Sequence, residues 1–262
     1  MRPRLMPLSA AVLLMTAVGA CSDAAGGTTT PTPSASAPPA ATGTPDARAA
    51  LAGRAAAAMD KAYAALYTLD QGGGKVRNVV ATVGADGTWK VDVGGGALGG
   101  TADVSLVSIS TGVYQCTISS ATNPITPTCV KLADAGKRVP KEYDLEVQRL
   151  FRQWLSVFTD RQAAIAVTEV QPLAGAKGDC FSVDSTAASL ADPVDIGIYC
   201  YSTDGVLTAA RVGFGVLKVV SESTGPATVQ LPGAVVAGPP MSLDAPPPVT
   251  QPVTPPSLAP SA

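Results

Sequence analysis

The stretch VRNVVATVGADGTWKVDVG, residues 76–94, has the pattern of two β-strands joined by a tight turn. In its second half the apolar side chains stand at every second position, at Trp89, Val91 and Val93. Such alternation is typical of a strand with one buried face. Asp86-Gly87 lies between the two halves and is a strong signal for a two-residue hairpin loop. The stretch therefore predicts an antiparallel hairpin with one apolar face.

Further strand patterns follow along the chain in two groups. The first group runs from residue 76 to residue 119 and the second from residue 165 to residue 232. Asp204-Gly205 gives the second group a hairpin signal of the same kind. We expect strands at VRNVVATV, TWKVDVG, TADVSLVSIS, GVYQCTIS, IAVTEVQPL, GDCFSVD, DIGIYCYS, VLTAARVGFGVLKVVSE and ATVQLP.

Two other segments have helical spacing. The Ala-rich segment 46–69 predicts an opening helix that ends before Gly72. In segment 140–165 the apolar residues form one stripe, made of Tyr143, Val147, Leu150, Phe151, Trp154, Leu155 and Phe158. This order of elements predicts an α+β fold in which both groups of strands join into one strongly curved antiparallel sheet, with the helices covering its concave face.

The first 20 residues have the composition of an export signal. A short basic head, Arg2 and Arg4, precedes an apolar run that is too short to span a bilayer comfortably. The run ends in VGAC, which resembles the lipobox of bacterial lipoproteins, whose cysteine thiol takes a diacylglycerol before cleavage makes it residue one. We expect Cys21 to anchor the protein to the extracytoplasmic face of the cell membrane. The alternative is an ordinary cleavage site that leaves a spare thiol.

Composition divides the remaining chain into three parts. After the signal peptide 1–20, we expect a lipidated cysteine with a disordered Ser/Thr/Pro spacer over 21–44, one domain over 45–236, and a disordered Pro-rich tail over 237–262.

The charged residues of the whole chain are 18 Lys and Arg and 20 Asp and Glu. The basic residues form no cluster, which argues against a nucleic-acid partner. The abundance of Ala, Gly, Pro and Val indicates a high-GC genome, as in actinobacteria.

Four cysteines remain besides Cys21, and in an exported chain they predict two disulfides. Antiparallel pairing of GDCFSVD with DIGIYCYS places Cys180 opposite Cys200. Cys116 and Cys129 then form the second pair. A metal site is the rival interpretation, but the chain has no histidine and no CxxC spacing.

The residues also argue against catalysis. Without histidine there is no Ser-His-Asp or Cys-His arrangement. GGGALG, residues 94–99, matches GxGxxG after a strand, but no helix follows it to meet a phosphate, so we expect a flexible or bulged hairpin. The carboxylate pairs Asp192 with Asp195 and Asp179 with Asp184 are interpreted as solvated loop residues. We expect no enzymatic activity, no cofactor and no metal.

The lipobox, the Thr/Pro spacer, the order of elements, the Asp-Gly hairpins and the closing VQLP together look like actinobacterial envelope lipoproteins of the LppX/LprG kind. The similarity spans about residues 45–235. Those proteins share a half-barrel fold with the periplasmic lipoprotein carrier LolA, and they hold acyl chains between helices and sheet without catalytic residues. The resemblance therefore implies a half-barrel that binds or carries an apolar ligand, such as an acyl chain or a glycolipid.

We expect a monomer whose ligand pocket lies where the alternating strand meets the apolar helical stripe. The candidate pocket residues are Trp89, Val91, Val93, Val147, Leu150, Phe151, Trp154 and Phe158. Binding there would be burial of apolar surface, at about 25 cal/mol per Å². The alternative is a non-catalytic envelope interaction or sensor lipoprotein with the same fold and a filled core. An acyl-sized cavity would favour the carrier, and a filled core would favour the interaction protein.

Overall fold

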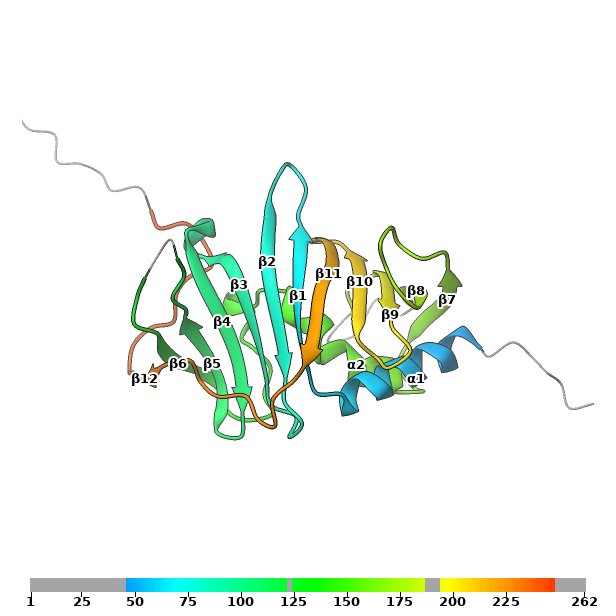
Figure 1. The fold of residues 1–262 in the computed structure, drawn as a ribbon, viewed down its shortest axis with the longest axis horizontal. Coiled ribbons are helices and arrows are strands. Elements are labelled where there is room, and N and C mark those ends of the chain that lie inside the picture. The colour runs from blue at the N-terminus through cyan, green and yellow to red at the C-terminus, as the bar shows by residue number, and fades with distance from the viewer. Residues whose placement is uncertain (1–45, 122–123, 187–193, 248–262) are drawn as a thin grey trace, which may run out of the picture. The chain divides into compact units, whose positions relative to one another are not determined.

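The computed structural model describes residues 46–121, 124–186 and 194–247. These residues form one large, predominantly antiparallel sheet of 12 strands, in the order β12-β6-β5-β4-β3-β2-β1-β11-β10-β9-β8-β7 (Figure 1). The end strands β12 and β7 do not pair with each other, so the sheet is not closed over the described part of the chain. The α+β class and the single antiparallel sheet are as predicted.

The strands are β1 Tyr63–Asp70, β2 Val76–Val83, β3 Trp89–Ala97, β4 Ala102–Ile109, β5 Gly112–Thr117, β6 Thr128–Ala133, β7 Ile165–Val170, β8 Asp179–Ser185, β9 Gly197–Tyr201, β10 Leu207–Val212, β11 Gly215–Thr224 and β12 Ala234–Val235. The α-helices are α1 Ala47–Asp60 and α2 Gln153–Thr159, and the 3-10 helices are η1 Leu98–Gly100, η2 Lys141–Tyr143 and η3 Val147–Leu150. None of the helices in the described ranges is long and apolar enough to cross a membrane.

The predicted opening helix is wrong beyond Asp60. α1 ends there, and Tyr63–Asp70 forms β1, which pairs with β2 on one side and with β11 on the other. β1 therefore joins the two groups of strands into one sheet. Its buried side chains alternate along the strand, at Tyr63, Ala65, Tyr67 and Leu69. Hydrogen bonding to two neighbouring strands and burial of these side chains override the helical spacing of the alanines.

The helix predicted over 140–165 is also wrong as one piece, because it is broken into η2, η3 and α2. The Asp144 carboxylate accepts a 2.9 Å hydrogen bond from the backbone N–H of Glu146. Glu146 has φ 62° and ψ −50° and is the centre of a γ-turn, closed by a 2.7 Å bond from Val147 N to Leu145 O. These local bonds replace the regular helical bonds, which is a common effect of aspartate side chains.

Both predicted hairpins form, each with a three-residue loop instead of a two-residue one. At Asp86-Gly87 the loop is closed by a 2.8 Å bond from Gly84 N to Thr88 O, and Gly87 has φ 80°. The Asp204-Gly205 loop is built in the same way, with φ 91° at its glycine. The glycine takes the left-handed bulge position that follows the turn, which adds one residue to the loop. Of the two alternatives expected for residues 94–99, a flexible or a bulged hairpin, the structure shows an irregular register, which shifts between Val93 and Ala97 where β3 pairs with β4.

The main core lies between the helices and one face of the sheet, which we call the inner face. Helix α1 contributes Leu51, Ala55 and Ala58, and α2 contributes Trp154, Leu155 and Phe158. Strands β1, β2, β3, β8 and β9 contribute alternate side chains to the same cluster. Both helices therefore bury their apolar sides against a single sheet.

The two predicted disulfides are confirmed, and each lies in a smaller apolar cluster. Cys116 of β5 bonds to Cys129 of β6, and Cys180 of β8 bonds to Cys200 of β9. The members of each pair stand directly opposite each other in the strand register. Because successive side chains of a strand point to opposite faces, Cys180 and Cys200 lie on the outer face, next to inward-facing Phe181 and Tyr199.

The strand predicted over 227–232 is wrong. This segment is irregular and is bonded to the β2–β3 hairpin, by a 3.1 Å bond from Ala85 N to Pro226 O and a 2.7 Å bond from Val229 N to the Thr88 hydroxyl. Pro226 and Pro232 lack the N–H that a sheet ladder needs, which favours this irregular path. β12 follows and pairs with β6 in parallel.

Candidate functional site

The structure brings all eight candidate pocket residues together at the inner face. Val91 and Val93 come from β3, and Val147 and Leu150 come from η3. Phe151 directly follows η3, and Trp154 and Phe158 belong to α2. These seven side chains belong to the main core, and each is 3% exposed or less. Trp89, the eighth, is half-buried and packs against that core.

The space between the candidate residues is occupied by their own side chains and their neighbours. The Phe151 ring lies 5.1 Å from that of Tyr67, and the Phe158 ring lies 5.1 Å from that of Tyr199. An internal cavity wide enough for an acyl chain would leave the side chains that line it with exposed surface. Tyr67, Leu150 and Tyr199 have none. The interior immediately around these three residues is therefore close-packed. At its margins, open hollows of about 630, 650 and 270 Å³ border Phe158, Trp154 and Trp89, respectively.

Four tyrosines in this core were missed in the sequence analysis, namely Tyr63, Tyr67, Tyr199 and Tyr201. Burial raises the pKa of all four hydroxyls well above its ordinary value, so they are neutral at physiological pH. The Tyr199 hydroxyl donates a 2.5 Å bond to the carbonyl of Asp195. Within the described residues the hydroxyl of Tyr201 has no hydrogen-bond partner, whereas that of Tyr67 interacts with the Tyr63 hydroxyl. The alternation of Tyr63, Ala65 and Tyr67 was the available signal for two of them.

A polar network at one side of the core centres on Arg149. Its guanidinium lies 2.6 Å from the Asp144 carboxylate and 3.2 Å from that of Asp195. The indole N–H of Trp154 donates a 2.9 Å bond to the second oxygen of Asp195. The network fixes the segment before β9 to η3 and α2, which gives Asp195 a structural role.

The carboxylate pairs considered for acid–base or calcium chemistry do not form a site among the described residues. Asp179 lies 2.6 Å from Arg54, while Asp184 is exposed. Asp192, like Cys21, lies outside the described residues. No group of three or more metal-ligating side chains occurs in the described ranges.

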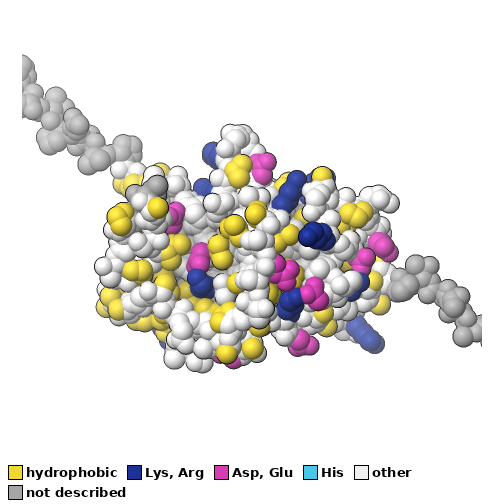
Figure 2. Space-filling view, in the orientation of Figure 1, with side chains coloured by type: hydrophobic (Ala, Val, Ile, Leu, Met, Phe, Trp, Pro, Cys, Tyr) yellow, Lys and Arg dark blue, Asp and Glu magenta, His cyan; other side chains and the backbone are white. Residues whose placement is uncertain are grey.

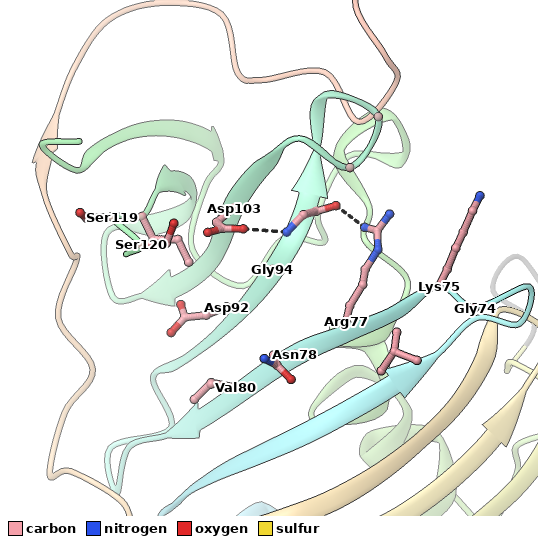
Figure 3. Close-up of a pocket in the computed structure, with 15 residues that line it drawn as sticks. Gly74, Lys75, Arg77, Asn78, Val80, Asp92, Gly94, Asp103, Ser119 and Ser120 are labelled. Carbon is pink, nitrogen blue, oxygen red and sulfur yellow. Dashed lines mark hydrogen bonds between the residues drawn. The ribbon is translucent and has the colours of Figure 1, made fainter. Parts of the chain in front are cut away.

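An open groove of about 700 Å³ lies across β2, β3 and β4 on the outer face (Figure 3). Asn78 and Val80 of β2 line it together with Asp92 and Asp103, and glycines of the β3–η1 region leave backbone exposed. The Asp103 carboxylate accepts a 2.8 Å bond from the N–H of Gly95. Asp92 lies 2.5 Å from Lys90 and 2.6 Å from the Ser105 hydroxyl. The carboxylates of this groove are thus engaged in local bonds.

The face seen in Figure 2 mixes apolar side chains with scattered charges of both signs. No protein-family model matches the chain, and no curated protein matches it either. The resemblance to envelope lipoproteins stays a prediction.

Proposed function

We propose that the protein is a lipid-anchored, extracytoplasmic lipoprotein that binds a partner through its surface and performs no catalysis. The observation that carries the proposal is the packing of the eight candidate pocket residues, seven of which are 3% exposed or less. A filled core was the outcome expected of an interaction lipoprotein. The lipid anchor on Cys21 and the monomeric state are parts of the same proposal.

The finer description of the fold as a LolA-like half-barrel also belongs to the proposal. Its support is an open antiparallel sheet with both α-helices packed on one face. In such an arrangement the helices stand where a carrier of that kind would hold its ligand. Here the aromatic rings of Tyr67, Phe151 and Phe158 fill that position.

Carriage of an acyl chain in the same space would require these side chains to move. The binding free energy would become more favourable by about 25 cal/mol for each Å² of acyl-chain surface that leaves water. It would also have to displace contacts in a close-packed interior, and overfilling such a core typically costs about 1–3 kcal/mol for even small additions. Burial of a whole acyl chain is therefore unfavourable in the packing described above.

The absence of histidine supports the non-catalytic part of the proposal, because the usual general base near neutral pH is missing from the whole chain. The buried tyrosines are held neutral, and the carboxylates of Asp144, Asp179 and Asp195 lie within ion-pair distance of arginines. The tyrosines are thus engaged in core packing and the carboxylates in ion pairs.

A fluorescence titration tests the proposal. The full exported chain is mixed with a dansyl-labelled fatty acid, whose emission rises when its label enters an apolar site. We expect no saturable rise, whereas serum albumin, the positive control, gives one. Saturable one-to-one binding to the protein would instead establish it as a carrier.

The anchor is tested separately by metabolic labelling with an alkyne-tagged palmitate analogue. The wild-type chain should take up the label and remain in the membrane fraction. The Cys21→Ser variant should lose both properties. A variant that keeps the label would refute the assignment of Cys21.

A further inference from the structure

The C-terminal segment crosses from one face of the sheet to the other. Val229 and Leu231 pack in the outer cluster around Cys116–Cys129. After the edge strand β12, the segment reaches the inner face, where Met241 packs against the main core. We call residues 238–245 the strap. They fall in the region 237–262 that was expected as a tail. The residues of that region from 248 onward lie outside the described residues.

The strap is held by four hydrogen bonds, all of which engage its backbone. The Gln115 side chain accepts a 2.6 Å bond from Met241 N and donates a 3.0 Å bond to Met241 O. The backbone N–H groups of Leu98 and Gly99 donate 2.9 Å bonds to the carbonyls of Ser242 and Leu243. Gln115, Leu98 and Gly99, which we call the seat, therefore bind an extended main chain through its backbone groups.

The side chains of the strap alternate as in an extended peptide bound along a groove. Met241 and Leu243 are half-buried, whereas Ser242 and Asp244 are exposed. At the end of the seat, a Cβ atom on Gly99 would lie 2.6 Å from the Cβ of Ala245, so the absence of a side chain there gives the strap room. The seat thus selects apolar side chains at two alternate positions and accepts polar ones between them.

The strap has the features of a segment that opens locally. Residues 234–237, which lead to it, are exposed, and no side chain of the strap is fully buried. The seat stands on β5 and η1, which the rest of the sheet holds in place. Few buried contacts mark the regions of lowest local stability in a protein.

We propose that the seat is a binding site for an extended peptide of a partner protein, and that the strap is its built-in competitor. The partner segment carries apolar side chains at two alternate positions, as Met241 and Leu243 do, and replaces the strap's backbone bonds one for one. This inference rests on the proposed function in one respect, that the partner bound at the surface is a protein. It adds the site and the chemical class of the ligand.

Tethering makes the strap a strong competitor. A segment joined to its site by a short flexible linker acts at an effective concentration in the millimolar range. A free peptide of the same sequence should therefore bind poorly to the wild-type chain. Weakening the strap should make the seat available.

The test uses the full exported chain with the two apolar strap side chains changed, Met241→Asp with Leu243→Asp. The probe is a fluorescein-labelled peptide of residues 236–247, followed by fluorescence anisotropy. We expect saturable binding to this variant and at least roughly tenfold weaker binding to the wild type, because the intact strap competes. The matched control, Ala237→Asp with Ser242→Asp, adds the same charge at exposed positions and should bind as weakly as the wild type.

Two further comparisons connect the signal to the seat. Adding Gln115→Ala to the strap variant should weaken peptide binding, and a probe peptide that itself carries the two Asp substitutions should not bind. In hydrogen exchange, the amides of Leu98 and Gly99 should lose protection in the strap variant and regain it when the peptide is added. Should the strap variant unfold, Met241→Ser with Leu243→Ser provides the same test with a milder change.

A folded strap variant that binds the peptide no better than the control would overturn the inference. That result leaves the proposed function standing, because a partner can bind elsewhere on the surface. Conversely, saturable binding of the dansyl-labelled fatty acid would overturn the proposed function whatever the peptide does. The two failures are therefore distinguishable.

Discussion

The rings of Tyr67 and Phe151 lie with their centroids 5.1 Å apart and their planes inclined at 51°. Tyr67 belongs to β1, the strand that joins the two halves of the sheet, and Phe151 directly follows η3. This contact therefore connects the middle of the sheet to the segment that covers it. It also occupies part of the space in which the sequence predicted a ligand pocket.

Removing either ring should destabilise the protein strongly. Phe151→Ala deletes a side chain that is 3% exposed, and Tyr67→Ala one that is fully buried. Each should lower the free energy of unfolding by about 3–5 kcal/mol, the usual cost of a large cavity in a core. Urea denaturation measures the change, and Val220→Ala, at a side chain that is 58% exposed, is the control. Losses below about 1 kcal/mol for both rings would contradict a tightly packed interior.

Removing only the buried hydroxyl of Tyr201 should not destabilise the protein. Within the described residues this hydroxyl is buried and has no hydrogen-bond partner. Tyr201→Phe should therefore leave stability unchanged or raise it by up to about 1 kcal/mol, because an unsatisfied polar group is removed. Thermal melting followed by circular dichroism measures this effect. A clear loss of stability would show that the Tyr201 hydroxyl makes a bond that stabilises the fold.

Glu146 stores backbone strain that glycine should relieve. Its φ of 62° is a conformation that non-glycine residues rarely adopt, and its side chain is exposed. We expect Glu146→Gly to raise the free energy of unfolding by about 1 kcal/mol. Glu142→Gly, in the regular turn of η2, should lower it instead. Equal losses at the two positions would rule out strain at Glu146.

The ion pair between Lys61 and Asp204 predicts a pH effect. Hydrogen bonds from Lys61 and then Ser202 lower the pKa of Asp204 below its ordinary value. A group with a lowered folded-state pKa adds stability above its unfolded-state pKa of about 3.9, and this contribution is lost as the pH falls through the folded value. Asp204→Asn should therefore reduce stability near neutral pH and flatten its decline in acid.

Urea denaturation at a series of pH values, for wild type and Asp204→Asn, measures this difference. The two side chains are 26% and 53% exposed, so salt should screen the pair. The gap between the two proteins should narrow in about 1 M NaCl. If the free energy of unfolding varied with pH in the same way for both proteins, the Lys61–Asp204 ion pair would not contribute to stability.

The elements that local chemistry determines could be predicted from the sequence. The β2–β3 hairpin follows from the alternation of Trp89, Val91 and Val93 and from Asp86-Gly87. The pairing of Cys180 with Cys200 follows from the register of two neighbouring strands. In both cases the interacting residues are close in sequence, so no tertiary information is needed.

Elements that depend on distant partners could not be predicted in this way. Tyr63–Asp70 continues an Ala-rich segment and becomes a strand because β11, far along the chain, pairs with it. The break at Glu146 depends on the Asp144 side chain, whose effect a periodicity count does not include. For the site, the apolar stripe predicted which residues meet, whereas the filling of the space between them depends on how side chains from several elements fit together.

The protein's own side chains fill the space between its helices and its sheet. Native mass spectrometry of the full exported chain, purified from membranes in mild detergent, tests this packing. We predict a mass equal to that of the mature polypeptide with its covalent anchor, and no lipid released when the protein is unfolded in the gas phase. A stoichiometric lipid that stays bound in the folded protein and leaves on unfolding would show that the interior holds a ligand.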